Sequence, residues 1–471
     1  MALRTPGDAT VAATPSQAGP SSSAVEARLR EAASELLAAH PRPLRTPARA
    51  AENRAMGALA ERPAVRAALF RLVDVAPACR SDSELAEHLL ALMSEADPGR
   101  GGGALGRLER LPGARRLLAR CAARGIRRMA RRFIVAETPR EALPALRSLW
   151  GEGVAASLDL LGERTVTSAE ADRYAQRCLA AIRDLGTATS AWPKLAHLER
   201  DHAGELPRAN LSVKVTALTP ALRPHAPSRG ISDARPRLRE LLRVARAEGA
   251  HLHIDMESFD SRDAVLELAL ELLAEPEFAR GPSAGVVLQA YLADAEPQLA
   301  RILEWARAVD REPPLTVRLV KGAYWDHEVI EAGLRGWESP VLAHKHDTDR
   351  SFEALTRRLI DARELVRTAI GSHNVRSVAY ALAYSDQVGA GEHAVEFQIL
   401  RGLGEEMQAA LAAQGLHVRA YCPVGELVAG MAYLVRRLLE NSSNDSFLVQ
   451  RALGRDLEAL IAPPGPKGVE A

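Results

Sequence analysis

Residues 251–291 read HLHIDMESFDSRDAVLELALELLAEPEFARGPSAGVVLQAY, and they contain one complete strand–helix–strand unit. The apolar runs Leu252–Met256 and Gly285–Ala290 predict two short, buried strands. Between them, Asp263–Leu273 repeats apolar residues at the three- and four-residue spacing of a helix. Because a parallel strand pair needs a crossover of about this length, we expect the two strands to be parallel neighbours.

The same unit recurs along the chain from about residue 150. The predicted strands are Ala155–Leu161, Leu211–Ala217, Leu252–Met256, Gly285–Ala290, Leu315–Val320, Leu365–Gly371, Ala394–Leu400 and His417–Tyr421. The helices predicted after them are Ala169–Leu185, Ala234–Glu248, Asp263–Leu273, Pro297–Val309, Arg350–Ala362, Val375–Tyr384, Glu405–Gln414 and Glu426–Glu440. Eight units predict an α/β fold, a (βα)8 barrel. A doubly wound sheet is the alternative, but no G-x-G-x-x-G follows the first strand to support a dinucleotide site.

The regions outside the barrel differ in composition. Residues 1–24 are mostly small and polar, which predicts a disordered tail, and residues 25–149 predict an all-helical region. Residues 150–460 form the predicted barrel, and residues 461–471 form a second loose tail. Neither a secretory signal nor a transmembrane stretch is visible. We therefore expect a cytoplasmic protein.

Charge and cysteine content exclude several classes of function. The chain has 61 Lys and Arg against 60 Asp and Glu, so its overall charge gives no argument for nucleic acid. Its four cysteines contain no CxxC pair, which excludes a cysteine zinc site and a disulfide scaffold. No His, Asp or Glu spacing favours a metal, and no G-x-S-x-G elbow favours a serine nucleophile.

A strongly basic segment lies at residues 107–132, with ten arginines and one glutamate. We favour a solvated or internally paired helix. A weak contact with the inner face of a membrane and a contact with DNA are the two alternatives.

Polar residues lie in the last residues of nearly every predicted strand or directly after it. They are Asp159, Glu163, Lys214, Asp255, Glu257, Gln289, Tyr291, Arg318, Lys321, Tyr324, Trp325, Ser372, His373, Asn374, Glu396, Gln398 and Tyr421. The carboxyl ends of barrel strands meet at one face, where the active sites of this fold lie. The sequence therefore predicts an active site there.

Two features favour an anionic ligand. Lys321-Gly322-Ala323 places a cation beside small residues, where backbone N–H groups can approach a phosphate. In the last predicted helix, Arg436 and Arg437 lie between Tyr433 and Glu440, and a guanidinium pair suits bidentate binding of a carboxylate or phosphate. An exposed, salt-bridged helix is the alternative.

Several of these segments, taken in order, resemble bacterial proline dehydrogenase. They are Leu211-Ser-Val-Lys-Val-Thr-Ala-Leu, His253-Ile-Asp, Val317-Arg-Leu-Val-Lys-Gly-Ala-Tyr-Trp-Asp, Ser372-His-Asn, Tyr421-Cys-Pro-Val-Gly and Tyr433-Leu-Val-Arg-Arg-Leu-Leu-Glu-Asn. The likeness covers roughly residues 150–450. It is strongest to the flavin half of the bifunctional bacterial proline utilization protein.

The resemblance implies a distorted (βα)8, TIM-like barrel that binds FAD at its strand ends. It implies oxidation of L-proline to Δ1-pyrroline-5-carboxylate by hydride transfer to flavin N5, the first step of proline catabolism to glutamate. Asp255 and Arg318 would be catalytic. The implied substrate-binding residues are Lys214, Leu319, Tyr324, Tyr421, Arg436, Arg437 and Glu163, where the two arginines clamp the carboxylate and Glu163 is a gate. The implied cofactor-binding residues are Met256, Gln289, Arg318, Val320, Lys321, Gly322, Ala323, Trp325, Ser372, His373, Asn374, Gln398 and Glu440.

The resemblance also implies partners and a specificity. A membrane quinone would accept the electrons. Because the sequence ends where the bifunctional relatives continue into an aldehyde dehydrogenase half, we expect a separate pyrroline-5-carboxylate dehydrogenase to carry out the next step. An aromatic residue at Tyr421 goes with proline rather than hydroxyproline. The family often has Thr-Arg-Lys where this chain has residues 343–345, Ala-His-Lys, so one cofactor contact is not expected.

Two other functions remain as alternatives. One is a flavin-bound regulator or sensor whose helical N-terminus binds DNA. The other is a barrel enzyme that acts on a phosphorylated metabolite without a flavin.

Overall fold

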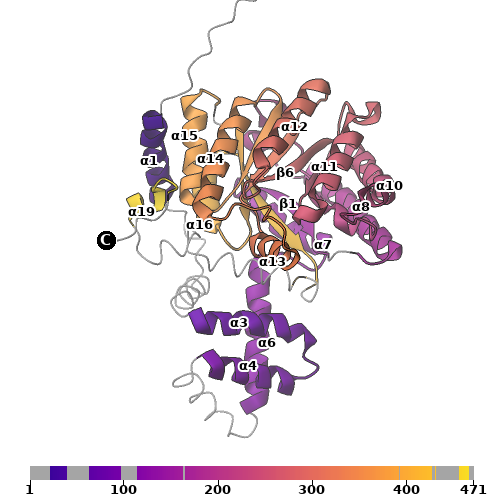
Figure 1. Cartoon of the computed structure of the whole chain (residues 1–471), viewed down its shortest axis with the longest axis vertical. Helices are drawn as coiled ribbons and strands as arrows, with labels where there is room; N and C mark the ends of the chain where they lie inside the picture. The colour runs from indigo at the N-terminus through magenta and orange to yellow at the C-terminus, as the bar shows by residue number, and fades with distance from the viewer. Residues whose placement is uncertain are drawn as a thin grey trace, which may run out of the picture.

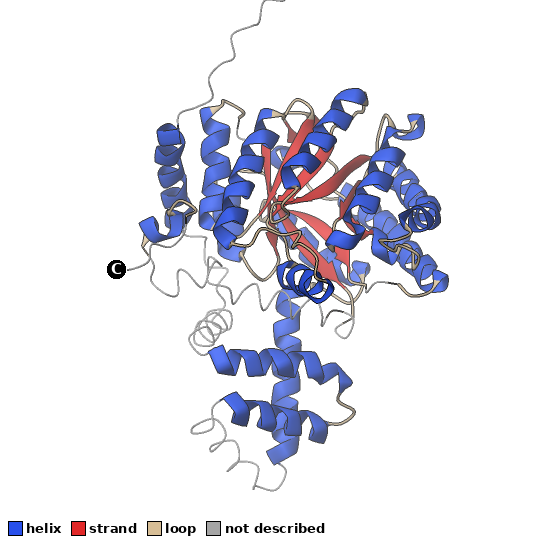
Figure 2. Ribbon diagram, viewed as in Figure 1, coloured by secondary structure: helices blue, strands red, loops and turns tan. Residues whose placement is uncertain are grey.

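A computed structural model describes residues 22–39, 63–96, 114–162, 165–391, 393–426, 430 and 456–465. Within them, eight parallel strands form a closed barrel (Figure 2). The strands are β1 Ala155–Leu160, β4 Asn210–Lys214, β5 His251–Asp255, β6 Ser283–Gln289, β7 Leu315–Val320, β8 Val366–Gly371, β9 Val395–Leu400 and β10 Val418–Val424. They follow one another in sequence order around the barrel, and β1 closes it by pairing with both β10 and β4. The predicted (βα)8 barrel is confirmed, and the doubly wound alternative is wrong.

The strands are buried on both faces. Every residue of β5 and β6 is buried, because one face packs inside the barrel and the other packs under helices. The covering helices are α8 Ser168–Ser190, α10 Pro227–Ala247, α11 Phe259–Ala274, α12 Ala295–Ala308, α14 Lys345–Asp361, α15 Val375–Gln387 and α16 Glu405–Ala413. A further helix, α13 Trp325–Arg335, follows β7 and ends at Gly336, whose φ of 66° is left-handed.

The preceding part of the chain is helical, as predicted. Its helices are α1 Ser22–Ala38, α3 Pro63–Val75, α4 Asp82–Ala96, α6 Ala114–Phe133 and α7 Pro139–Gly151. Helices α3, α4 and α6 form a group below the barrel in Figure 1, whereas α1 packs against α15. The α6 end is attached to the barrel: the Val135 amide donates to the carbonyl of Pro423 at 2.8 Å.

Some predicted boundaries are wrong. The strand predicted at Leu211–Ala217 ends at Lys214, and Val215–Ala217 form a 3-10 turn although they are β-branched or small. The last strand continues to Val424, past its predicted end at Tyr421. Helix α13 and the short hairpin β2 Arg200–Asp201 and β3 Gly204–Glu205 were not predicted. Apart from Glu426 and Gly430, the predicted helix Glu426–Glu440 lies outside the described residues, as do most of both predicted tails.

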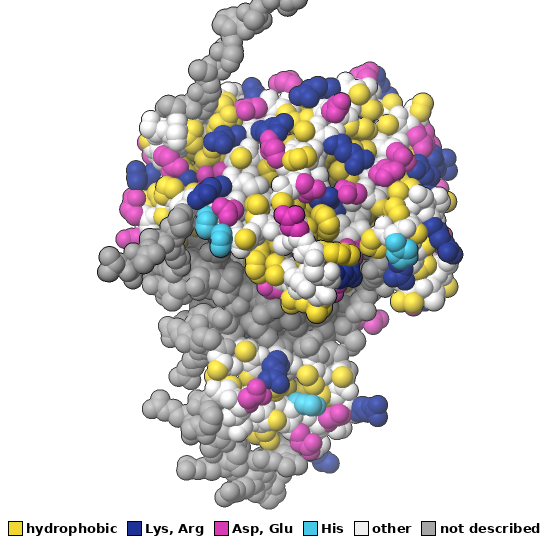
Figure 3. Space-filling model, viewed as in Figure 1, with side chains coloured by type: hydrophobic (Ala, Val, Ile, Leu, Met, Phe, Trp, Pro, Cys, Tyr) yellow, Lys and Arg dark blue, Asp and Glu magenta, His cyan; other side chains and the backbone are white. Residues whose placement is uncertain are grey.

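The visible surface carries mixed charges. Figure 3 shows Lys, Arg, Asp and Glu interspersed over the barrel, with apolar side chains gathered over α13, where Ile330, Leu334 and Trp337 are exposed. No described helix is long and apolar enough to cross a bilayer. The described part of the basic segment forms helix α6. Whether this helix is solvated, internally paired or in contact with a membrane or DNA stays a prediction.

Candidate active site

A cluster of charged side chains lies at the carboxyl ends of the strands, centred on Asp255. This residue ends β5, and its carboxylate accepts hydrogen bonds from Arg318 Nη1 at 2.6 Å and from the Tyr421 hydroxyl at 2.7 Å. Lys214 Nζ lies 4.0 Å from the same carboxylate. Arg318 and Tyr421 come from β7 and β10, so one buried carboxylate joins three strands that are not neighbours.

Lys214 has a second, closer partner that the sequence-based site omitted. Its ammonium contacts the carboxylate of Asp159, which is almost fully buried near the end of β1. Burial alone would lower the pKa of Lys214, but Asp159 and Asp255 outweigh it and raise that pKa above its usual value. Lys214 therefore stays cationic at neutral pH. The only sequence signal for Asp159 was its place at a strand end.

Arg318 Nε and Gln289 Oε1 are among the buried polar atoms at this face that have no partner among the described residues. The other Arg318 nitrogen, Nη2, donates to Ser212 at 3.2 Å, and Gln289 Nε2 donates to the carbonyl of Glu257 at 3.1 Å. Both side chains are therefore fixed in position. Because β6 and β7 are paired neighbours, the two unpartnered atoms belong to adjacent strands, and a bound group could satisfy both.

The segment after β7 forms a close backbone approach. Gly322 has a φ of 127°, and a Cβ there would lie 2.4 Å from the ring of Tyr291. A side chain is therefore excluded on both counts. Next to it, the Asp349 carboxylate contacts Lys321 at 2.5 Å and Lys345 at 2.7 Å. Two cations beside this close backbone approach suit an anion such as a phosphate.

The segment after β8 is held by its own hydrogen bonds. The Asn374 side chain caps α15 by accepting from the Ser377 amide at 2.9 Å. The backbone N–H of Asn374 donates to Ser372 Oγ at 3.2 Å, and His373 Nε2 accepts from the backbone N–H of Leu400 at 2.9 Å. These contacts place the amino end of α15 at the carboxyl end of the barrel, where helix N–H groups favour negative charge.

The other predicted site residues are placed less directly. Met256 and Leu319 are buried, Val320, Gly322 and Tyr324 are half-buried, and Ala323 is exposed. Trp325 begins α13 and donates its indole N–H to the carbonyl of Leu342 at 2.9 Å. Gln398 donates to Glu396 on the same strand at 2.5 Å. Glu163, Arg436, Arg437 and Glu440 lie outside the described residues, so the carboxylate clamp and its gate stay predictions. Among the described residues, no group of three or more His, Cys, Asp or Glu could hold a metal ion.

Two family profiles match the chain. The proline dehydrogenase profile covers residues 142–450, the barrel and the helix before it. The chain belongs to the proline dehydrogenase family. The profile of the proline utilization A N-terminal domain covers residues 26–133, which include α1, α3, α4 and α6.

Named relatives agree with this membership. The chain is 34% identical over 349 residues to bifunctional protein PutA of Escherichia coli, covering 72% of this chain and 25% of the relative. It is 27% identical over 325 residues to proline dehydrogenase of Deinococcus radiodurans, covering 69% of this chain and 90% of the relative. The chain thus spans only a quarter of the E. coli relative and most of the Deinococcus one.

Solved structures show the same arrangement. Proline utilization A of Bdellovibrio bacteriovorus, inactivated by N-propargylglycine, has a TM-score of 0.82 and 32% identity. The match covers 95% of this chain and 45% of that chain. The protein from Bradyrhizobium japonicum matches with a TM-score of 0.69 over 93% of this chain. The helical N-terminal region therefore belongs to the shared architecture.

Proposed function

We propose that this protein oxidises L-proline to Δ1-pyrroline-5-carboxylate with FAD as its cofactor and passes the electrons to a membrane quinone. Family membership supports the reaction class. The observation that carries the proposal is the cluster of Asp255, Arg318, Lys214 and Tyr421 at the carboxyl face of the barrel. A barrel that served only as a scaffold would gain little from burying these charges, because even a paired buried charge is often no more stabilising than apolar packing.

The residues present fit FAD. Gln289 Oε1 and Arg318 Nε offer one acceptor and one donor for a polar ring, since both are buried without partners in the described chain. The glycine at 322 and the cations Lys321 and Lys345 suit phosphates. We propose that these residues and Met256, Val320, Ala323, Trp325, Ser372, His373, Asn374, Gln398 and Glu440 hold the cofactor. Bound FAD would supply the two-electron acceptor for the substrate hydride.

The charges of the site suit a zwitterion. Asp159 and Asp255 balance Lys214 and Arg318, so the described cluster is close to neutral as a whole. We propose that Arg436 and Arg437 clamp the proline carboxylate, that Asp255 lies beside the amine, and that Leu319 and Tyr324 line the pocket. Holding a small substrate by both charged ends fixes its C5 in one place, which lowers the entropic part of the barrier.

The reaction removes two hydrogens from proline, one as a hydride and one as a proton. The C5–H bond breaks with its electron pair, the amine loses one proton, and the nitrogen lone pair then forms the C5=N double bond. Asp255 and Ser212 hold the Arg318 guanidinium in place. Its fixed positive charge would stabilise the negative charge that bound FAD would gain with the hydride. Tyr421 is fixed by Asp255, and its ring would crowd a hydroxyl on C4 of the substrate.

The proposal includes a setting in the cell. We propose a cytoplasmic protein that meets the inner face of the membrane only peripherally, where a quinone takes the electrons. The product hydrolyses to an aldehyde, so a separate pyrroline-5-carboxylate dehydrogenase would consume it. We expect no nucleic acid partner.

A steady-state assay tests the proposal. The purified protein, supplied with FAD and a short-chain quinone, should consume L-proline and release a product that o-aminobenzaldehyde traps. D-Proline and trans-4-hydroxy-L-proline serve as matched substrates and should react much more slowly. If the protein binds FAD but oxidises none of the three, the sensor alternative is favoured. If it binds no FAD, the proposal is wrong.

A further inference from the structure

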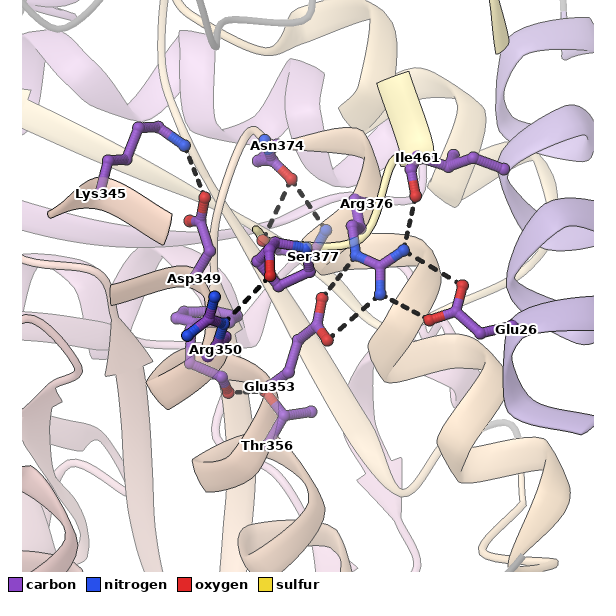
Figure 4. A network of polar contacts seen from close by, with 12 residues as sticks. Glu26, Lys345, Asp349, Arg350, Glu353, Thr356, Asn374, Arg376, Ser377 and Ile461 are labelled. Carbon is purple, nitrogen blue, oxygen red and sulfur yellow. Dashed lines mark hydrogen bonds and ion pairs between the residues drawn. The ribbon is translucent and has the colours of Figure 1, made fainter. Parts of the chain in front are cut away.

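Arg376 is the second residue of α15, and its buried guanidinium is the centre of a polar network (Figure 4). All three of its nitrogens donate. Nε bonds Glu353 at 2.7 Å, Nη2 bonds Glu26 at 2.6 Å, and Nη1 bonds the carbonyl of Ile461 at 2.5 Å. These partners come from α14, from α1 and from the end of α19 Leu457–Ile461. One side chain therefore joins four elements that are far apart in the sequence.

Both ends of the described chain reach the barrel at this point. Helix α1 buries the apolar residues Val25, Leu29 and Leu36 and packs along α15 (Figure 1). Ion pairs add to this packing: Arg28 contacts Asp386 of α15 at 2.7 Å, and Arg30 contacts Glu458 of α19 at 2.9 Å. We call α1 together with residues 456–465 the terminal clasp. It lies outside the barrel, away from the charged cluster around Asp255.

The network extends from the clasp to two segments of the proposed cofactor site. Residues 372–374 lie directly before α15, and Asn374 caps this helix. Arg376, in the first turn of the same helix, anchors it. On α14, Glu353 lies one turn after Asp349, the residue that holds Lys321 and Lys345. Arg376 thus ties the first turn of α15 to the first half of α14.

A buried charge resists displacement. Moving Arg376 away from Glu26 and Glu353 would leave its own buried charge and two half-buried carboxylates without these partners, which is costly. The first turn of α15 is consequently fixed both along its axis and around it. Segments that hold a ligand need such support, because a small displacement of a binding group is enough to weaken binding.

We propose that Arg376 is a positioning residue for the half of the cofactor site that binds phosphates, and that the terminal clasp locks it in place. The inference rests on the proposed function, because it takes residues 372–374 and Lys321 as cofactor contacts. It goes further in giving α1 and the C-terminal segment a role in cofactor retention. The C-terminal segment also reaches α14 directly, because Arg350 Nε, one residue after Asp349, donates to the carbonyl of Pro464 at 3.0 Å.

Equilibrium binding of FAD to the apoprotein tests the proposal, measured by quenching of flavin fluorescence. Arg376→Gln should raise the Kd for FAD by about tenfold or more, the effect expected when contacts that orient ligating groups are lost. Glu26→Gln should raise it by a smaller factor, because the bond to Glu353 remains. Once saturated with FAD, both variants should keep the wild-type KM for L-proline, since the substrate residues are untouched.

The chain offers a matched control for each variant. Arg367 is equally buried, pairs with Asp201 at 2.8 Å and donates to the carbonyl of Glu205 at 3.1 Å. It lies near the amino end of β8, at the opposite end of that strand from residues 372–374, so Arg367→Gln should lower Tm without changing the Kd for FAD. Glu31→Gln is the control for Glu26→Gln, because Glu31 is on α1 but exposed.

The outcomes separate the two claims. A selective loss of FAD affinity in Arg376→Gln, or in Glu26→Gln if the first variant does not fold, supports the proposal. Wild-type affinity in both, or an equal loss in Arg367→Gln, overturns it while leaving the proposed function standing. A wild-type protein that takes up no FAD overturns the proposed function and this inference together.

Discussion

Tyr421 and Asp255 are hydrogen-bonded at 2.7 Å across the mouth of the barrel, although β10 and β5 are separated by two other strands. The second carboxylate oxygen of Asp255 accepts from Arg318 at 2.6 Å. One carboxylate therefore sets the position of an aromatic ring and of a guanidinium, whose centre lies 5.3 Å from that ring. Both groups are in the site that we propose for L-proline.

Replacing Asp255 should impair catalysis, and it should also lower stability because buried Arg318 would lose its carboxylate partner. Asp255→Asn keeps the shape of the side chain but removes the charge that holds Arg318 and Tyr421. We expect kcat/KM for L-proline to fall by about a hundredfold or more, the loss that follows misplacement of a positioned group. Steady-state kinetics with FAD in excess measure this. Ser212→Ala, which removes the longer bond to Arg318 and a contact with Ser157 but leaves Asp255 in place, is the control and should cost less.

Asp159 should prove essential for stability because it neutralises Lys214. Asp159 is the closer carboxylate beside Lys214, and without it only the more distant Asp255, at 4.0 Å, is left to pair with the buried ammonium, so Asp159→Asn should lower the free energy of unfolding by roughly 3 kcal/mol at pH 7. In the wild type the pKa of Lys214 is raised in the folded state. Its contribution to the free energy of unfolding therefore stays constant as the pH rises to the pKa of a lysine in the unfolded chain. In the variant, burial no longer opposed by Asp159 favours the neutral amine. Urea unfolding from pH 7 to 10 should show the two proteins converging, and parallel curves would contradict the assignment.

Gly322→Ala should reduce cofactor retention without unfolding the barrel. The new Cβ would collide with the Tyr291 ring, and the φ of 127° is unfavourable for alanine. Gly336→Ala is a matched control, because its φ of 66° is also left-handed but the space around it is open. We expect the first variant alone to lose bound FAD during dialysis. Equal retention by both would remove Gly322 from the cofactor site.

The barrel interior should make the protein sensitive to acid. Burial lowers the pKa of His417 to about 4, despite the Glu396 carboxylate at 3.1 Å, and Arg419 adds to the lowering. The unfolded chain binds a proton near pH 6.5 whereas the folded one does not. Stability is therefore full above that pH and falls as the pH drops toward 4, by up to roughly 3 kcal/mol for this group.

Urea unfolding at several pH values measures this loss. His417→Gln should flatten the decline between pH 6.5 and 4, whereas His225→Gln, at an exposed position, should leave it unchanged. Buried His251 and His253 also have lowered pKa values, so part of the decline should remain. A variant at His417 with the full wild-type decline would refute the attribution.

The alternation of strands and helices was readable because each strand is short, apolar and bounded by a helix of the correct period. Leu252–Met256 and Gly285–Ala290 both became strands of the barrel. The local signal failed at Val215–Ala217, where β-branched and small residues resemble strand but the chain turns above the barrel. Propensity correctly predicted a strand at Leu211–Lys214, but the place of Lys214 at the end of the barrel, and not propensity, decided where that strand ends.

Contacts between distant parts of the chain could not be predicted in this way. The sequence placed Lys214 and Asp255 in one site because both end a strand, but it did not show that Asp159 is the closer partner of Lys214. Nor did it show that α1 packs on α15, because amphipathicity gives a helix a buried face without naming what covers it. The network of Arg376 follows from that packing and carries no local sequence signal.

The visible absorption spectrum of the purified protein, recorded before and after anaerobic addition of L-proline, tests the central claim most directly. The account predicts the visible spectrum of an oxidised flavin, which bleaches with L-proline and not with trans-4-hydroxy-L-proline. A flavin band that persists with L-proline would contradict the proposed substrate. A colourless protein that does not take up added FAD would contradict the account of the whole site.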